Sequence, residues 1–125
     1  MKRVAFVVLY ALLAIHSPSF AQTTAVSVQE AAQLHADKKA IIVDVREDDE
    51  WQAEHIKGAI HIPLNELEQR LTELKSYKNT QIITQCRSGK RSAQAATVLQ
   101  AAGFDKVYNM EGGLMEWEKQ GLKVE

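Results

Sequence analysis

The chain has 125 residues, of which 46% are hydrophobic and 25% charged, a size and composition typical of one globular domain and too small for two. Its formal net charge of −1 gives no indication of a nucleic-acid-binding protein. With 1 cysteine, the chain cannot form an internal disulfide.

The N-terminus has the pattern of a secretory signal peptide. Two basic residues precede an uncharged apolar run over residues 4–15, and small residues follow it. The run is shorter than the roughly 20 residues that span a bilayer, although an uncleaved anchor is the alternative. We therefore expect a signal peptide over residues 1–21, cleaved after Ala21, and a single domain over residues 22–125. The protein is expected to be exported, to the periplasm of a bacterium, with no stable membrane span after cleavage.

The expected domain begins with a helix and a buried strand. Residues 22–25 are expected to be flexible. Ser27 begins the capping-box pattern Ser-Val-Gln-Glu, which predicts a short helix after it. Residues 40–45 form a continuous apolar run rich in β-branched side chains, which is typical of a strand buried on both faces in a parallel sheet.

Asp44 and Arg46 lie where this strand is expected to leave the core. Ligands of open parallel sheets bind beyond the carboxyl ends of the strands, so the two side chains could face a site. The alternative, which we favour, is that they pair with neighbouring loops and give structural support to the rim of the sheet.

Two helices are predicted between this strand and the next. Acidic residues favour a helix N-terminus, so residues 47–50 are expected to begin a short helix anchored by Trp51. A turn and a short extended segment follow and end at Pro63. Asn65 is expected to cap the second helix. Its apolar face is expected to consist of Leu67, Leu71 and Leu74.

The segment Ile82–Ser92 contains the candidate catalytic site. An apolar run leads to Cys86, and an alanine-rich helical pattern begins at Ala93. A strand, a tight loop and a helix in this order direct backbone N–H groups and the helix dipole at the thiol. Both stabilise the thiolate, which is the nucleophilic form of cysteine. The alternative is that Cys86 is a small buried hydrophobic residue.

Three positive charges and a glycine within five residues of Cys86 favour the reactive thiol, because a cysteine that only packs needs neither. Of the cations, Lys90 and Arg91 are expected to face the mouth of the loop more than Arg87. The residues expected to bind an anionic substrate beside Cys86 are Arg87, Ser88, Gly89, Lys90, Arg91 and Ser92.

The remaining elements complete the predicted fold. A strand is expected over residues 106–110, and a Glu-Gly-Gly turn leads to a last helix that buries Leu114 and Trp117. Helices that alternate with buried strands predict a three-layer α/β fold with a mainly parallel central sheet flanked by helices. The histidines show no metal-ligand spacing, so we expect no metal site and no cofactor.

Several short motifs are linked along the chain. They are Asp44-Val45-Arg46, Glu50-Trp51, His55–Pro63, Cys86–Ser92 and Glu111-Gly112-Gly113 with Trp117. In this order they resemble the rhodanese-like domain family, over about residues 26–121. Glu54 departs from the pattern, because many members of the family have glycine at this position in the turn.

The resemblance implies a small single-domain thiosulfate sulfurtransferase. In such an enzyme Cys86 attacks the outer sulfur of thiosulfate or a similar sulfane donor, sulfite leaves, and a persulfide remains on the cysteine. Cyanide or a thiol then removes the sulfur. The implied partners are therefore a small anionic sulfur donor and a thiophilic acceptor, with no nucleic acid.

Two other functions remain open on the sequence. A cysteine phosphatase or arsenate reductase carries Cys-x-x-x-x-x-Arg, whereas the sixth residue after Cys86 is Ser92 and Arg91 falls one short. The shorter loop is expected to be too small for phosphate. The second alternative is a protein that carries sulfane sulfur or pairs with a redox partner through Cys86 without turnover.

Overall fold

In the described part of the chain the central sheet has five strands, all parallel, in the order β1-β5-β4-β2-β3. The computed structural model describes Ala5 and residues 23–125. The signal peptide expected over residues 1–21 therefore lies, apart from Ala5, outside the described residues. None of the helices in the described part of the chain is long and apolar enough to cross a membrane.

The elements alternate along the chain as the apolar runs predict. The strands are β1 (Thr24–Val26), β2 (Ala40–Asp44), β3 (Ile60–His61), β4 (Gln81–Gln85) and β5 (Val107–Met110). The α-helices are α1 (Val28–Ala36), α2 (Asp48–Ala53), α3 (Lys90–Ala101) and α4 (Gly113–Lys119). Two 3₁₀ segments, η1 (Leu64–Glu66) and η2 (Glu68–Tyr77), connect β3 to β4.

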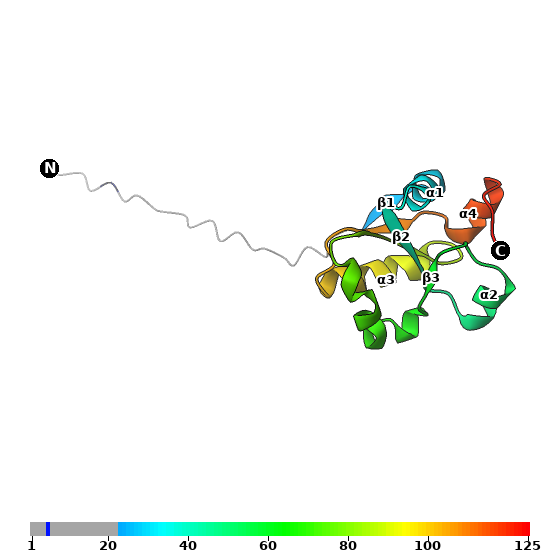
Figure 1. Ribbon diagram of the computed structural model, residues 1–125. Helices are drawn as coiled ribbons and strands as arrows, with labels where there is room; N and C mark the ends of the chain where they lie inside the picture. The colour runs from blue at the N-terminus through cyan, green and yellow to red at the C-terminus, as the bar shows by residue number, and fades with distance from the viewer. Residues whose placement is uncertain (1–4, 6–22) are drawn as a thin grey trace.

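Helices cover both faces of the sheet (Figure 1). Successive residues of a strand point to opposite faces, so Ile42 packs in the core under α1 and α4, while Val43 packs in the core under α3 and the 3₁₀ segments. In the neighbouring strand β4, Ile83 packs on the same side as Ile42, and Ile82 packs on the same side as Val43. The predicted three-layer α/β fold with a parallel sheet is confirmed.

The N-terminal segment differs from its prediction. Thr24–Val26 is not a flexible end but an edge strand, paired in parallel with β5 from Thr24 opposite Tyr108 to Val26 opposite Met110. Three residues cannot form a strand alone, because a strand needs a partner for its backbone hydrogen bonds. The partner lies more than eighty residues away in the sequence, so the local pattern gave no sign of it.

The helix expected after Asn65 is also different. The segment forms the two 3₁₀ pieces η1 and η2, which begin after Pro63 and Leu67, and Asn65 is inside the first rather than capping it. Residues three apart are aligned along a 3₁₀ helix, and the leucines at positions 71 and 74 have this spacing. Leu67 and Leu74 are fully buried, so the apolar face was identified correctly although the type of helix was not.

Candidate functional site

The loop between β4 and α3 folds tightly around Cys86. β4 is the central strand and ends at Gln85, so Cys86 lies at the carboxyl end of a parallel strand, where such sheets bind ligands. Gly89 precedes α3 with a φ of 102°. Side chains disfavour this left-handed conformation, so glycine allows the chain to turn directly from the thiol into the helix.

The Sγ atom of Cys86 is surrounded by hydrogen-bonding groups. The Gly89 amide donates to Sγ at 3.1 Å, and Ser92 Oγ lies 3.3 Å from Sγ. Burial raises the pKa of the thiol, but hydrogen bonds with the Ser92 side chain and with the amides of Ser92, Gly89 and Ser88 outweigh it and lower the pKa below its usual value. The loop therefore favours a thiolate although Cys86 is 0% exposed.

Helix α4 holds the other side of the loop. Leu114 N donates to the Cys86 carbonyl at 2.8 Å, and Met115 N donates to the Arg87 carbonyl at 3.0 Å. A Cβ atom on Gly113 would lie 2.5 Å from the backbone of Arg87, so only glycine allows the helix to approach so closely. Because α4 binds the loop carbonyls, the loop amides are free to point at Sγ.

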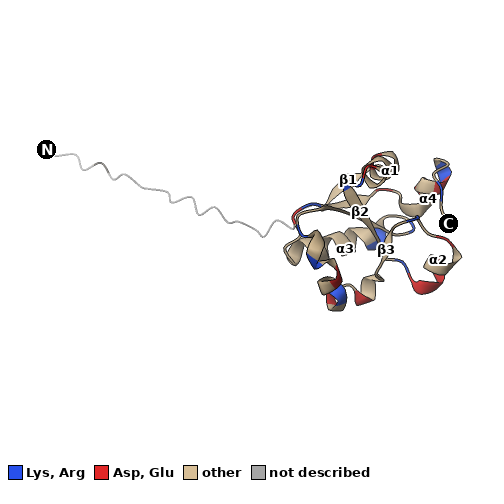
Figure 2. Cartoon of the chain, viewed as in Figure 1, with Lys and Arg blue, Asp and Glu red and all other residues tan. Residues whose placement is uncertain are grey.

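The three cations near Cys86 have different surroundings: Arg87 lies in the loop, whereas Lys90 and Arg91 are the first residues of α3. Arg87 and Lys90 are exposed, and neither forms a salt bridge with a residue between 23 and 125. Arg91 instead donates from Nη1 and Nη2 to the two carboxylate oxygens of Glu50 at 2.7 and 3.0 Å. The hydrogen bond with Arg91 lowers the pKa of Glu50 to about 2. Arg91 thus joins the loop to the acidic N-terminal part of α2 (Figure 2).

Asn109 of β5 completes the hydrogen-bonded surroundings of Cys86, and the motifs around the cysteine did not predict it. The Ser92 hydroxyl donates to Asn109 Oδ1 at 2.6 Å, and Asn109 Nδ2 donates to the Gly89 carbonyl at 3.1 Å. Thr84 Oγ1 also donates to the Ser92 carbonyl at 2.8 Å. The one signal in the sequence is that a polar side chain interrupts the strand just before the Glu-Gly-Gly turn.

The family model of the Rhodanese-like domain matches residues 27–120, which include the Cys86 loop and the elements α2, α4 and β5 that contact it. The chain belongs to the rhodanese-like domain family. This agrees with the resemblance noted from the motifs, and the parallel sheet flanked by helices matches the rhodanese-like fold of its structural neighbours.

Individual proteins are similar to this chain over about two thirds of its length or more. The putative sulfur carrier protein YrkF of Bacillus subtilis (strain 168) is 41% identical over 85 residues, which are 68% of this chain and 45% of YrkF. The thiosulfate sulfurtransferase GlpE of Tolumonas auensis is 31% identical over 96 residues, 77% of this chain and 89% of GlpE. The structure of a thiosulfate sulfurtransferase from Pseudomonas aeruginosa superposes with a TM-score of 0.74 at 30% identity, over 82% of this chain and 20% of that one.

These relatives include sulfurtransferases, so the rhodanese-like domain places the chain in a family with sulfur-transfer homologues. The chain spans less than half the length of YrkF and 62% of the B. subtilis protein YqhL, with which it is 39% identical. The activity, substrates and partners of those longer proteins therefore apply to this chain only as proposals.

Asp44 and Arg46 form a buried ion pair in this rhodanese-like domain. Arg46 Nη2 lies 2.8 Å from Asp44 Oδ2, with the two side chains 3% and 0% exposed. The same guanidinium donates to the carbonyls of Glu50 and Glu54 at 3.3 and 2.8 Å. The pair therefore binds the backbone of α2, and through it supports the helix that holds Arg91.

His35, His55 and His61, the histidines among residues 23–125, take part in packing and backbone contacts. His55 and His61 stack on Trp51, with ring centroids 3.8 and 4.7 Å away. His35 Nε2 lies 2.9 Å from the Lys57 carbonyl oxygen. Within residues 23–125, no group of three or more His, Cys, Asp or Glu side chains is arranged to hold a metal ion.

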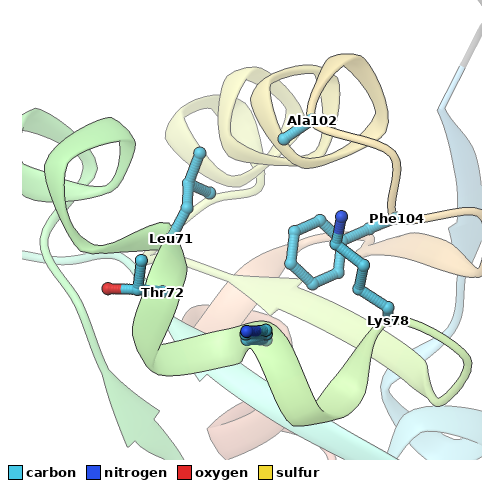
Figure 3. Close-up of a pocket in the computed structure, with 6 residues that line it drawn as sticks. Leu71, Thr72, Lys78, Ala102 and Phe104 are labelled. Carbon is cyan, nitrogen blue, oxygen red and sulfur yellow. The ribbon is translucent and has the colours of Figure 1, made fainter.

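A groove of about 480 Å³ lies at the far end of α3 (Figure 3). Cys86 lies before the N-terminus of α3, whereas Ala102, which lines the groove, follows its C-terminus. A helix of 12 residues is about 18 Å long, so the groove is separate from the thiol. Its lining consists of Leu71, Thr72, Lys75, Lys78, Ala102 and Phe104.

Proposed function

We propose that the protein is a thiosulfate sulfurtransferase that works through a persulfide on Cys86. The observation that carries the proposal is the single cysteine at the carboxyl end of β4, with the Gly89 amide 3.1 Å from Sγ and the loop amides lowering its pKa. The similarity to GlpE and to the P. aeruginosa enzyme supports thiosulfate as the donor.

The chemistry follows from the charge on Sγ. The thiolate attacks the outer sulfur of thiosulfate, the Sγ–S bond forms, and sulfite leaves with the electron pair of the broken S–S bond. The negative charge then rests on the outer sulfur of the persulfide, which the inward amides stabilise as they stabilise the thiolate. A thiol or cyanide attacks that sulfur and restores the thiolate of Cys86.

The exposed cations suit an anionic donor. Thiosulfate carries two negative charges and approaches a thiolate, so the encounter is repulsive unless positive charge lies nearby. Arg87 on the loop and Lys90 at the start of α3 are exposed, while the charge of Arg91 is offset by Glu50 at 2.7 Å. We therefore assign donor capture to Arg87 and Lys90, and a bracing role to Arg91.

The test is the intact mass of the protein after thiosulfate and then after cyanide. We expect the mass of one sulfur atom to be gained and then lost, and sulfite to be released in equal amount. Cys86→Ser should gain no sulfur and should lose all measurable turnover, because a serine hydroxyl is not ionised near neutral pH and is a weak nucleophile. Retained turnover in that variant, with an unchanged circular dichroism spectrum, would disprove the role of Cys86.

A sulfur carrier is the second candidate, and the similarity to the putative sulfur carrier YrkF favours it. A carrier loads one sulfur atom and keeps it until a partner protein accepts it. Steady-state thiocyanate formation from thiosulfate and cyanide separates the two functions. Many turnovers per molecule indicate an enzyme, and a single turnover indicates a carrier.

A phosphatase is disfavoured by the loop. Cysteine phosphatases bind phosphate with an arginine six residues after the cysteine, where this chain has the fully buried Ser92. Arg91 is one residue too early and binds Glu50 in a bidentate manner. The expected result is no hydrolysis of an aryl phosphate by protein that turns over thiosulfate.

A further inference from the structure

The Ser92 hydroxyl lies between two acceptors but has one proton. Its Oγ atom is 2.6 Å from Asn109 Oδ1 and 3.3 Å from Cys86 Sγ. Asn109 Nδ2 donates to the Gly89 carbonyl, which orients the amide so that its acceptor oxygen faces Ser92. While Cys86 is a thiol, Ser92 must therefore be the donor to Asn109, and the thiol donates to Ser92 Oγ. The Ser92 side chain lowers the pKa of Cys86 only when its hydroxyl turns to donate to the thiolate.

Ionisation of Cys86 changes which acceptor needs the proton. A thiolate has no hydrogen to donate, so Ser92 stabilises it only by turning its O–H from Asn109 to Sγ. The turn removes from Asn109 Oδ1 the hydroxyl that donates to it at 2.6 Å. Asn109 is half-buried, and losing this hydrogen bond costs free energy, so Asn109 and the thiolate compete for one proton.

We propose that Asn109 is a positioning residue that holds the Ser92 hydroxyl away from Cys86 and thereby limits the fraction of thiolate in the unloaded protein. The inference deepens the proposed function, and what it implies for sulfur loading rests on that proposed function. When Sγ bonds to the sulfane sulfur and sulfite leaves with the electron pair, Sγ loses its charge. The hydroxyl then returns to Asn109, so Asn109 favours the persulfide over the free thiolate.

The competition can be separated from the charges around the loop. β4 and β5 contain no Asp, Glu, Lys, Arg or His, so the hydrogen-bonded chain itself is neutral. Substitutions at Asn109 and Ser92 leave the surrounding charges in place. The charged residues on the loop and on the helices around it are Arg87 on the loop, Lys90 and Arg91 on α3, Asp48, Asp49 and Glu50 on α2, and Glu116, Glu118 and Lys119 on α4.

The test is the pH dependence of Cys86 alkylation by iodoacetamide in the full domain. Asn109→Leu removes the competing acceptor and leaves the thiol form with an unsatisfied donor. We expect the midpoint of alkylation to fall by about one pH unit, because a lost buried hydrogen bond corresponds to about one unit of pKa. In the Ser92→Ala background there is no hydroxyl to release, so the same substitution should not lower the midpoint.

The controls separate this role from simple bracing of the loop. Asn109→Thr is neutral, keeps an oxygen acceptor for Ser92 and loses the donor to the Gly89 carbonyl, so its midpoint should fall less than that of Asn109→Leu. If Asn109 only braces the loop, Asn109→Leu raises the midpoint or leaves it unchanged, and the proposal is overturned. Asn109→Val, which suits a strand, replaces the leucine variant if that variant does not fold.

The result is independent of sulfur transfer, because alkylation needs no sulfur donor. A lowered midpoint in Asn109→Leu together with no thiosulfate turnover would retain the positioning role and refute the sulfurtransferase. Normal thiosulfate turnover with an unchanged alkylation midpoint would refute the positioning role of Asn109 and retain the sulfurtransferase.

Discussion

At the scale of single residues, the reactivity of Cys86 depends on short contacts with neutral donors more than on nearby charges. A neutral amide lies 3.1 Å from Sγ, inside the protein, where hydrogen bonds to a charged atom are strong. Arg87 and Lys90 are exposed to water, which weakens their effect on the thiol. In the proposed function the exposed cations therefore serve donor capture, while the backbone amides favour the thiolate of Cys86.

Glu50→Gln tests the pair that connects the loop to α2. The pKa of Glu50 is lowered to about 2, so the pair stabilises the fold above the ordinary carboxyl pKa and loses this effect as the pH falls towards 2. Since the pair is partly exposed, we expect Glu50→Gln to cost about 1 kcal/mol of unfolding free energy at pH 7. Denaturant unfolding between pH 7 and pH 2 should show the difference shrink to nothing.

The matched control for this variant is Glu73→Gln, which breaks the exposed pair of Glu73 with Arg70. Its effect on unfolding at pH 7 should be smaller, because that pair lies on the solvated surface of η2. Equal stability of the Glu50→Gln protein and the unaltered protein at pH 7 would contradict the bracing role of Arg91.

Donor capture by the exposed cations predicts a dependence on salt. Arg87→Ala and Lys90→Ala should each raise the KM for thiosulfate about two- to fivefold at low ionic strength, and less at high ionic strength, because salt screens exposed charges. Steady-state kinetics across a range of sodium chloride concentrations gives the comparison. Lys106→Ala removes an exposed cation at the amino end of β5 and should leave the KM for thiosulfate unchanged at both low and high ionic strength. A KM that does not depend on salt in any variant would exclude electrostatic capture.

At the scale of elements, the site depends on the contact between the β4–α3 loop and α4. The carbonyls of Cys86 and Arg87 accept from amides of α4, so the helix and the loop form one hydrogen-bonded unit. The two glycines of the Glu-Gly-Gly turn have φ values of 80° and 59°, which place α4 against the loop. The turn is therefore as important for the site as the loop itself.

Gly113→Ala should disrupt this unit. The added Cβ would lie 2.5 Å from the Arg87 carbonyl group, a clash that only displacement of α4 relieves. We expect a loss of about 2–4 kcal/mol of unfolding free energy and a rise in the alkylation midpoint of Cys86, because the amides no longer point at Sγ. Thermal unfolding and alkylation at several pH values measure the two effects.

Gly121→Ala is the control for backbone strain alone. Gly121 also has a positive φ, 75°, but a Cβ there meets nothing within 4 Å. This variant should lose about 1–2 kcal/mol and leave the alkylation of Cys86 unchanged. If both alanine variants behave alike, the close approach of α4 does not position the loop.

At the scale of the whole molecule, the fold brings the carboxyl ends of the strands to one edge, and β1 adds an edge strand beside β5. Cys86, the Asp44–Arg46 pair and Asn109 come from three neighbouring strands at that edge. We propose further that the protein is exported to the periplasm, and the apolar run over residues 4–15 behind two basic residues supports this. An exported thiol without a disulfide partner must be kept reduced by another system.

Expression of the full chain in a bacterium tests export. We expect periplasmic protein with the mass of a chain that begins at Gln22, because cleavage after Ala21 removes the apolar run. Lys2→Glu with Arg3→Glu should reduce export and leave uncleaved chain in the cells. Full-length protein in the cytoplasm for both chains would disprove the signal peptide.

The sequence by itself determined the parallel α/β architecture and the position of Cys86 directly after a buried strand. Apolar runs such as residues 40–45 and the strand–loop–helix pattern around Cys86 are local, and both are found in the structure, although α3 begins at Lys90 rather than at Ala93. Tertiary structure alone decided the edge strand β1, the Arg91–Glu50 pair, 41 residues apart, and the Ser92–Asn109 hydrogen bond, 17 residues apart. These contacts depend on where distant segments meet after folding, and no local pattern of side chains specifies such a meeting.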